Sequence, residues 1–416
     1  MLISYLMEYN RYCNVIGIGV VLLIAWLLSS DRNRISLRVI LSSLALQFTL
    51  AFIALKTESG VRFFTACANG MRALYGYAQQ GICFLLGKLG VAQEPWGVVF
   101  VLQILPAIIF FGAFMAVLFH FGIVQRIIKV MNAVIQPLMG TSAPETLCAV
   151  ANSFLGQTES PLLIRPYLER LTRSEMFVVM VSGMGTMSGS ILAVYNSFGV
   201  PMEHLLAASV MAVPASIMIA KIMIPESEKV AQAENATVEV ERKGNIFEAI
   251  ATGTSDGLYL FLNVAAMLLA FVALIGFING TLAQLMLLCN SLFHTSYAPV
   301  TLETVFGYIF LPFGYLLGFV GKKALLVGQL LGKKVAINEF FAYRDLVGMG
   351  FDVRTLNIVT YALAGFSNFS CIGIQVGGIG ALVPSKRKML TELGVRAVIG
   401  GALTNLITAM VAGLFL

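Results

Sequence analysis

The chain has 416 residues, of which 58% are hydrophobic and only 12% are charged. A soluble protein usually carries about 25% charged residues, and long continuous apolar runs do not suit the alternating strands of a barrel. The composition therefore excludes a soluble domain and indicates an all-α polytopic membrane protein. The net charge of +6 arises from loops between apolar segments, so we expect no nucleic-acid partner.

Eight apolar segments approach the roughly 20 residues that cross a bilayer as a helix. Basic residues cluster after the first segment, before the fourth and before the last, and the positive-inside rule places these loops in the cytoplasm. Charges that follow the first apolar run favour an uncleaved signal anchor whose N-terminus is outside. The expected spans are residues 12–30, 37–55, 97–120, 175–199, 203–224, 257–280, 355–380 and 392–416.

Three further segments do not fit a simple span. Residues 57–93 mix basic and aromatic side chains, which predicts a helix lying in the membrane interface. Residues 225–246 are polar and predict a cytoplasmic linker between two halves of the protein. Residues 304–320 are apolar but short and contain Pro312, so we do not assign them a span.

Two short polar strings lie in mostly apolar stretches. An ionisable group at membrane depth costs at least roughly 2.5–3.5 kcal/mol, so such a group suggests a functional site. The surrounding regions, 143–170 and 322–350, are too polar and too broken to cross alone, which predicts two re-entrant hairpins with the strings at their tips. The first string is Gly156, Gln157, Thr158 and Glu159, and the second is Asn338 and Glu339.

Each tip is followed by a hydrophobic segment that small polar residues interrupt. The first interrupted segment is 182–190, and the second is 365–371. Each half of the chain therefore has the order hairpin, broken helix and final helix. The loop charges after the two broken helices predict opposite sidedness, which indicates an inverted repeat as found in transporters.

The polar groups of these segments can form many hydrogen bonds and include no arginine. This combination suits a neutral ligand with a base-like edge and several hydroxyl groups, and it disfavours a phosphorylated substrate. The groups are the amide of Gln157, the hydroxyl of Thr158, the carboxylates of Glu159 and Glu339, the amides of Asn338 and Asn368, and the aromatic face of Phe366.

The broken helices also suggest a site for a coupling ion. Unwound backbone frees carbonyl oxygens, which can coordinate a hard cation such as Na⁺. The positions where the first tip and the first broken helix would meet are Asn152, Leu155, Thr186 and Met187. Glu159 could carry a proton instead, and the sequence chemistry does not choose between Na⁺ and H⁺.

Each feature has a simpler interpretation when it is taken singly. Stretches rich in glycine and serine usually mark close helix packing in membranes. The cysteines and histidines are scattered, so neither a transition-metal site nor a disulfide framework is expected. The occurrence of a polar tip and a broken helix in both halves is what favours a transport site.

The chain resembles the concentrative nucleoside transporter family at these motifs. The resemblance extends from about residue 10 to the C-terminus, with the motif order and flanking spans in place. It is similar to bacterial members, which implies a multi-pass protein of the bacterial cytoplasmic membrane. The matching residues are 156–162, 338–343, 365–370 and 377–380.

The resemblance implies an elevator-type homotrimer with eight transmembrane helices, two re-entrant hairpins and interfacial helices in each protomer. The implied parts are a scaffold at 1–130, the first half of a transport domain at 131–224, a linker at 225–256, further scaffold at 257–320 and the second half of the transport domain at 321–416. The implied partners are a nucleoside such as uridine, a sodium ion and membrane lipid, with no other cofactor.

The resemblance also assigns roles to individual residues. Gln157, Thr158 and Glu159 would contact the base with Ile191 nearby, and Glu339 and Asn368 would hold the ribose beside Phe366. The sodium site would map to Asn152, Leu155, Thr186 and Met187. Cys371 and Thr186 stand where many relatives carry serine, and a thiol is a poorer hydrogen-bond partner than a hydroxyl. No role is assigned to Lys322 and Lys323.

The function that follows is secondary active import of nucleosides, driven by a sodium gradient. Proton coupling is the main alternative. A passive channel and a membrane-embedded enzyme are less favoured, because paired hairpins suit alternating access and no nucleophile–base pair or metal cluster is evident. We therefore expect a transporter and no enzyme.

Overall fold

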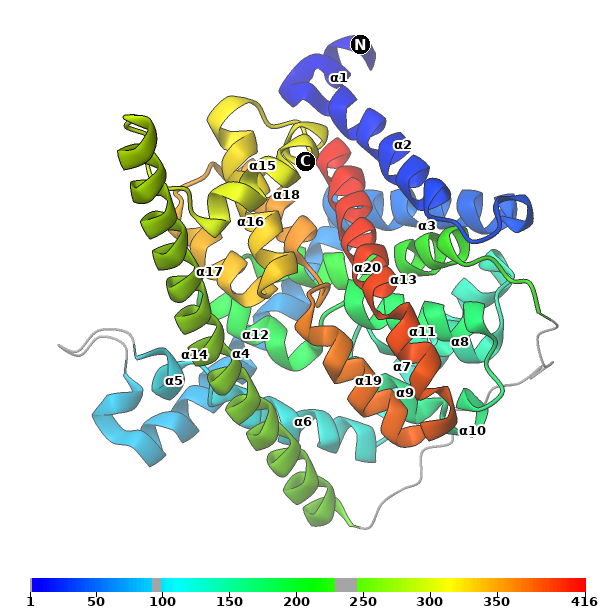
Figure 1. Cartoon of the computed structure of the whole chain (residues 1–416). Coiled ribbons are helices and arrows are strands. Elements are labelled where there is room, and N and C mark those ends of the chain that lie inside the picture. Colours follow the sequence, from blue (N-terminus) through cyan, green and yellow to red (C-terminus); the bar gives the residue numbers. More distant parts are fainter. Residues whose placement is uncertain (1, 92–98, 229–244) are drawn as a thin grey trace.

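The computed structural model describes residues 2–91, 99–228 and 245–416 (Figure 1). Every regular element in these ranges is a helix, so the all-α prediction is confirmed. Seven of the described helices are long and apolar enough to span a membrane, or up to eight if one bent pair counts as a span. The predicted count of eight spans stays a prediction.

The first three predicted spans correspond to helices at the expected places. Helix α1 (Leu2–Met7) precedes α2 (Arg11–Leu27), and α3 (Leu37–Lys56) follows. Residues 97 and 98 lie outside the described residues, and the rest of the third span forms α5 (Phe100–Gln103) and α6 (Ala107–His120).

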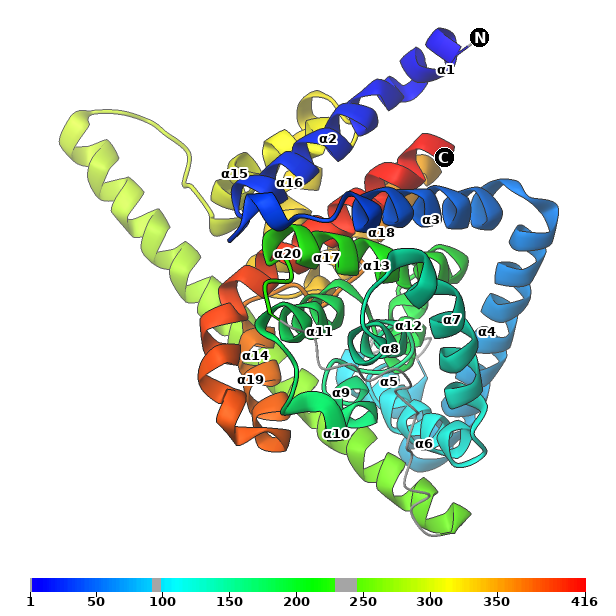
Figure 2. The same ribbon diagram turned by 90° about the vertical axis from the view of Figure 1, so that its right-hand side faces the viewer.

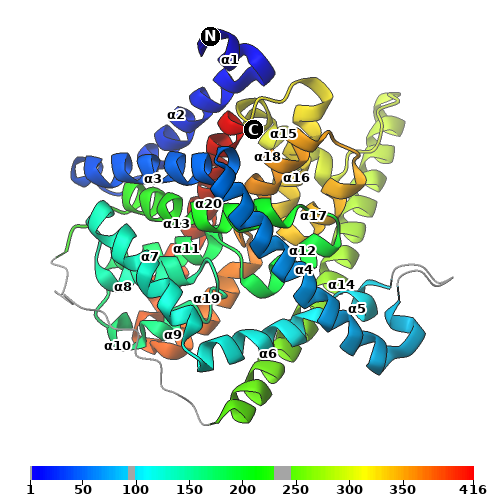
Figure 3. The same cartoon turned by 180° about the vertical axis from the view of Figure 1, so that it is seen from behind.

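The predicted interfacial segment forms α4 (Glu58–Leu86), followed by the short η3 turn (Gly87–Gly90). Thr57 ends α3 and caps α4, where its hydroxyl accepts a hydrogen bond from Gly60 N at 3.1 Å. The chain turns a sharp corner at this cap, and α4 then runs along one face of the molecule (Figures 2 and 3). Its position in the membrane interface stays a prediction.

Helix α7 (Ile123–Met139) was not predicted from the sequence. Gly122 and Gly140 bound it, and both have a left-handed backbone (φ 71° and 68°) that glycine adopts without strain. The expected domain boundary at 130/131 falls inside this helix, and the division into domains stays a prediction.

The first predicted hairpin is present as short helices around a polar turn. Helix α8 (Ala143–Ala151) leads to the tip, and α9 (Ser160–Leu163) and α10 (Arg165–Leu168) return from it. At the start of α8, Ser142 N donates to the Glu145 carboxylate at 2.8 Å. This satisfies one backbone donor at the N-terminal end of the helix.

The second predicted hairpin consists of α16 (Gly321–Ala336) and α17 (Glu339–Gly348), with Asn338 between them. The Asn338 carboxamide caps α17 by accepting from Phe341 N at 3.2 Å. The unassigned segment 304–320 is largely helix α15 (Leu302–Leu316), which is bent by 116° from α16. The polar hairpin is therefore preceded by an apolar helix that packs on it.

Both predicted broken helices are confirmed. The chain breaks at Thr186–Ser188 between α11 (Arg173–Gly185) and α12 (Gly189–Ser197). It breaks again between α18 (Val353–Leu363) and α19 (Ser370–Leu382). Helix α13 (Met202–Met223) follows the first pair, and the η4 turn (Pro384–Lys386) and α20 (Arg387–Phe415) follow the second.

Helix α14 (Ile246–Phe293) overlaps two expected segments, the linker at 225–256 and the span at 257–280. It has 48 residues, and its stretch Val272–Phe293 is long and apolar enough to span a membrane. Asn245 caps α14 by accepting from Glu248 N at 3.0 Å, so the polar sequence there starts a helix. Residues 229–244 of the linker lie outside the described residues.

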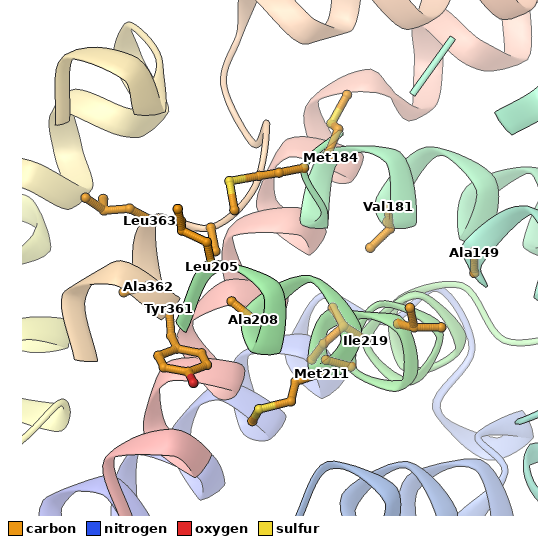
Figure 4. Packing of buried hydrophobic residues seen from close by; sticks show 14 of the residues in the cluster. Ala149, Val181, Met184, Leu205, Ala208, Met211, Ile219, Tyr361, Ala362 and Leu363 are labelled. Atoms are coloured by element: carbon orange, nitrogen blue, oxygen red, sulfur yellow. The ribbon is translucent and has the colours of Figure 1, made fainter. Parts of the chain in front are cut away.

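The core surrounds the broken helices. Helices α11, α12, α13 and α20 are mostly buried, whereas α2, α3 and α6 expose most of their length and the Val272–Phe293 part of α14 is not buried. Met184 and Leu363, which precede the two breaks, lie with Leu205 in the same part of this core (Figure 4). Burial therefore separates an inner group of helices from an outer one.

Candidate functional site

Gln157, at the first tip, contacts the second broken helix. Its side-chain Nε2 donates to the Cys371 thiol at 3.2 Å, and its Oε1 accepts from Gln375 Nε2 at 3.1 Å. Gly183 makes room for this side chain, because a Cβ there would lie 2.9 Å from Gln157 Cβ. The tip and α19 therefore meet against α11.

Glu339, at the second tip, is 4% exposed and has two side-chain donors. Tyr195 donates its hydroxyl to Oε1 at 2.7 Å, and Asn368 donates Nδ2 to Oε2 at 3.2 Å. Tyr195 comes from α12 and Asn368 from the second break. A buried carboxylate is tolerated only with such partners, so its environment is built around a negative group.

The two tips are joined through Asn368. Its Oδ1 accepts from Cys371 N at 3.1 Å and from the Ser370 hydroxyl at 2.6 Å. A connected series of contacts therefore runs from Gln157 through Cys371 and Asn368 to Glu339. We call this series the polar chain. It brings together residues from both hairpins and the second broken helix, and Tyr195 of the first broken helix binds its Glu339 end.

Four further predicted ligand residues make no side-chain hydrogen bond to the polar chain among the described residues, although Phe366 O accepts from Asn368 N at 2.8 Å. Thr158 packs its methyl group against Gly378, and Glu159 is exposed with one carboxylate oxygen 3.4 Å from Gly156 N. Ile191 is buried and Phe366 is half-buried. The structure therefore connects Gln157, Cys371, Asn368 and Glu339 in one series, and the ligand roles of the other four residues stay predictions.

The predicted ion-site residues meet where the first tip contacts the first break. Asn152 Nδ2 donates to the Ser182 hydroxyl at 2.9 Å, and the Thr186 hydroxyl donates to Ser182 O at 2.8 Å. Gly189 N donates to Phe154 O at 3.0 Å, which fixes the tip to the break. Asn152, Leu155, Thr186 and Met187 are all buried.

The donor set fits a small hard cation. Asn152 Oδ1 is buried and has no hydrogen-bond partner among the described residues. An orphaned carboxamide oxygen is costly in an apolar site, and a cation would satisfy it. The Thr186 hydroxyl keeps lone pairs for a cation, because its hydrogen is directed to Ser182 O.

Sequence reasoning missed several residues of this region. Tyr195 and Gln375 are ordinary helix residues by pattern, and their contacts with Glu339 and Gln157 join positions 144 and 218 residues apart. Lys334 is 2% exposed. It is a charged residue in the mostly apolar helix α16, and that pattern is the sequence signal that could have marked it as a functional position. Lys323, which had no assigned role, donates to Asp352 at 2.6 Å and so fixes the start of α16 to the start of α18.

Two broken helices with paired polar tips in an all-helical, multi-span protein define a secondary transporter. Comparison with known families gives the same class. Residues 204–413 match the Na⁺ dependent nucleoside transporter C-terminus, residues 16–89 match the Na⁺ dependent nucleoside transporter N-terminus, and residues 101–202 match the nucleoside recognition (Gate) family.

Known proteins resemble the chain over nearly its whole length. A nucleoside permease, NupC of Helicobacter pylori, is 36% identical and the match covers 99% of both chains. The structure of CNTnw in an inward-facing substrate-bound state is 36% identical, with a TM-score of 0.89 over 97% of this chain and 98% of that one. A CNTnw variant in an outward-facing state gives a TM-score of 0.90 at 36% identity over 97% of each chain.

The chain belongs to the concentrative, Na⁺-dependent nucleoside transporter family. It is thus a multi-pass membrane transporter with bacterial relatives and not an enzyme. Solved structures that share its fold include inward-facing and outward-facing states.

Proposed function

We propose that this protein imports nucleosides such as uridine by symport with Na⁺ across the bacterial cytoplasmic membrane. The observation that carries the proposal is the polar chain, which links both hairpin tips through the second helix break. Tyr195 of the first broken helix binds Glu339, so a ligand at the polar chain would contact segments from both halves of the protein. Membership of a nucleoside transporter family supports the substrate class.

The polar chain supplies the groups that a nucleoside needs. Gln157 offers an amide to the base, with Thr158, Glu159 and Ile191 beside it and Phe366 flanking the ligand. Glu339 and Asn368 accept from and donate to ribose hydroxyls, and the carboxylate makes these bonds charge-assisted. Tyr195 holds the carboxylate in a fixed orientation before the ligand arrives.

Coupling follows from the contact between the ion site and the first tip. Na⁺ at Asn152, Leu155, Thr186 and Met187 would order residues 152–159 and so place Gln157 for the base. This is positive coupling between two sites, so the nucleoside must also raise the affinity for Na⁺. One charge moving through 100 mV supplies about 2.3 kcal/mol, which supports roughly 40- to 50-fold accumulation.

The movement we propose is an elevator motion of the inner helices against the outer ones within a homotrimer. The inner, transport part comprises α8–α13 and α16–α20, and the outer scaffold comprises α2–α6 and α14. The contrast in burial between these groups supports the division. The inward-facing and outward-facing structures of CNTnw support alternation between two states.

The test is uptake of radiolabelled uridine into proteoliposomes, with Na⁺ and pH gradients imposed separately. We expect accumulation with an inward Na⁺ gradient and none with a pH gradient alone. Accumulation driven only by the pH gradient would replace Na⁺ with H⁺. Equilibration without accumulation under either gradient would indicate a passive channel.

A further inference from the structure

Lys334 is a buried cation whose hydrogen bonds go to neither the polar chain nor the ion site, although it interacts electrostatically with Glu339. It lies on α16 and is 2% exposed. Its ammonium donates to Asn405 Oδ1 at 2.6 Å and to Ala362 O at 3.1 Å. Ionisable residues inside transmembrane bundles are rare and mark functional positions, so this lysine requires an explanation.

Asn405 of α20 connects Lys334 to both helix breaks. Its Nδ2 donates to Gly185 O at 2.7 Å and also to Ala364 O. Gly185 is the last residue of α11, and Ala364 is the first residue after α18. One side chain therefore accepts from the buried cation and donates to the C-terminal ends of two half-helices.

The two breaks cross in direct contact at this point. A Cβ on Gly365 would lie 2.5 Å from Asn405 Oδ1 and 2.9 Å from the Gly185 carbonyl carbon. Only glycine fits such a separation without displacing backbone, so the crossing depends on Gly365. A small shift of the Asn405 side chain would therefore displace the backbone at both breaks.

The helix ends at the crossing and Lys334 carry charges of opposite sign. The C-terminal end of a helix carries roughly half a negative charge, so the ends of α11 and α18 together carry about one. Both helices exceed ten residues, with 13 in α11 and 11 in α18, so both end dipoles are developed. The positive charge of Lys334 is attracted to these helix ends and also to the Glu339 carboxylate, in a place where no bulk water screens it.

The position of Lys334 also corresponds to that of the ion site in the other half. The candidate Na⁺ residue Asn152 directly follows α8, the first helix of the first hairpin, and contacts α11. Lys334 lies in the last turn of α16, the first helix of the second hairpin, and contacts the end of α18. In the first half, Asn152 brings a cation-binding carboxamide from the first hairpin to α11. In the second half, Lys334 brings a cation from the second hairpin to α18.

We propose that Lys334 is a resident cation that fills a second cation site, formed by Asn405 and the C-terminal ends of α11 and α18. In the second half of the protein, the Lys334 ammonium occupies the position that corresponds to the coupling Na⁺ site of the first half. The lysine is a positioning residue, since it orders the breaks that carry Thr186 and Asn368 without touching the nucleoside. Its role in transport rests on the proposed function, whereas the existence of the cation site does not.

The test separates the cation from the packing of the side chain. Lys334→Ala removes the three outer methylene groups and the nitrogen, and Lys334→Met keeps most of the volume without charge. Lys322→Ala is the matched control, because Lys322 is exposed in the first turn of the same helix. Each purified protein is assayed for its melting temperature and for uridine uptake, with n-propylammonium or tetramethylammonium added.

We expect n-propylammonium to raise the melting temperature of Lys334→Ala in a saturable way, because it restores the missing atoms and the N–H donors. Tetramethylammonium has no N–H group and should have no effect, and neither ion should act on the wild type or Lys322→Ala. Uptake should fall roughly tenfold or more in both Lys334 variants and recover with n-propylammonium only in Lys334→Ala.

Two results would overturn the proposal. One is a Lys334→Met protein whose melting temperature and uptake equal those of the wild type, because the charge would then be dispensable. The other is a Lys334→Ala protein that is folded but gains no stability from n-propylammonium. The melting data do not depend on the substrate, so a wild type that fails to accumulate uridine would count against the proposed function alone.

Discussion

The Asn368 side chain donates its Nδ2 to Glu339 Oε2 at 3.2 Å, and both side chains are buried. This contact joins the second hairpin tip to the second helix break, 29 positions further along the chain. The Tyr195 hydroxyl, from the first broken helix, binds the other carboxylate oxygen. The orientation of Glu339 is therefore set by residues from both halves of the protein before a ligand binds.

Glu339→Gln should reduce uridine uptake by at least about tenfold. The neutral amide loses charge-assisted hydrogen bonds worth about 1.5–3 kcal/mol. The measurement is the initial rate of uptake into proteoliposomes, with the melting temperature as a control for folding. Near-normal uptake in the folded variant would remove Glu339 from the ligand site. We also expect deoxyuridine to be a poorer substrate than uridine in the wild type.

Tyr195→Phe should raise the KM for uridine by about three- to tenfold, because Glu339 Oε1 loses its hydroxyl donor. Tyr343→Phe is a suitable comparison, since the Tyr343 hydroxyl donates to Thr360 O at 2.8 Å instead. That variant should lose stability with little change in KM. Equal effects on KM in both variants would mean that Tyr195 acts only through packing.

Cys371→Ser should lower the KM for uridine by about two- to tenfold. A hydroxyl is a stronger hydrogen-bond partner than a thiol, and the Cys371 thiol accepts from Gln157 Nε2. Cys371→Ala removes the polar atom at similar size and should raise the KM. If serine and alanine have the same effect, the contact between Gln157 and Cys371 does not contribute to binding.

Asn152→Ala should raise the Na⁺ concentration for half-maximal uptake by roughly tenfold, because a buried carboxamide oxygen is lost from the candidate ion site. The maximal rate at saturating Na⁺ should change less. Ser153→Ala is the neighbouring control, since the Ser153 hydroxyl donates back to Val150 O, in the last turn of α8, at 2.7 Å. An unchanged Na⁺ dependence in Asn152→Ala would place the ion elsewhere.

Lys323→Met tests the ion pair at the start of α18. Burial opposes ionisation of Asp352, but hydrogen bonds from Lys323 and Thr355 outweigh it and lower the pKa of Asp352 to about 2. The stability from this carboxylate is therefore complete above its ordinary pKa of 3.8 and is lost as the pH falls towards 2.

The pair is partly exposed, so we expect Lys323→Met to cost no more than about 1 kcal/mol at neutral pH. The melting temperature of the variant should approach that of the wild type as the pH falls below about 4, and neutral uptake should be unaffected. A constant difference between the two proteins down to pH about 2 would contradict the assignment.

The sequence predicted elements well where a physical signal is local. Long apolar runs identified α2, α3 and α13, and polar interruptions identified the breaks at Thr186 and near Asn368. It failed where the signal was mixed. The amphipathic α7 contains basic and amide residues, a composition that is also typical of a loop. The first turns of the 48-residue α14 are polar, so the sequence there favours a linker.

The sequence by itself determined that the chain lies in a membrane, that its backbone breaks at two places, and which polar groups stand at those breaks. These properties depend on composition and on short-range patterns along the chain. Only the tertiary structure decided that Gln157 contacts Cys371, that Tyr195 contacts Glu339, and that Lys334 meets Asn405. The physical reason is that these contacts join residues 71 to 214 positions apart, and their partners are chosen by how the helices pack around the two breaks.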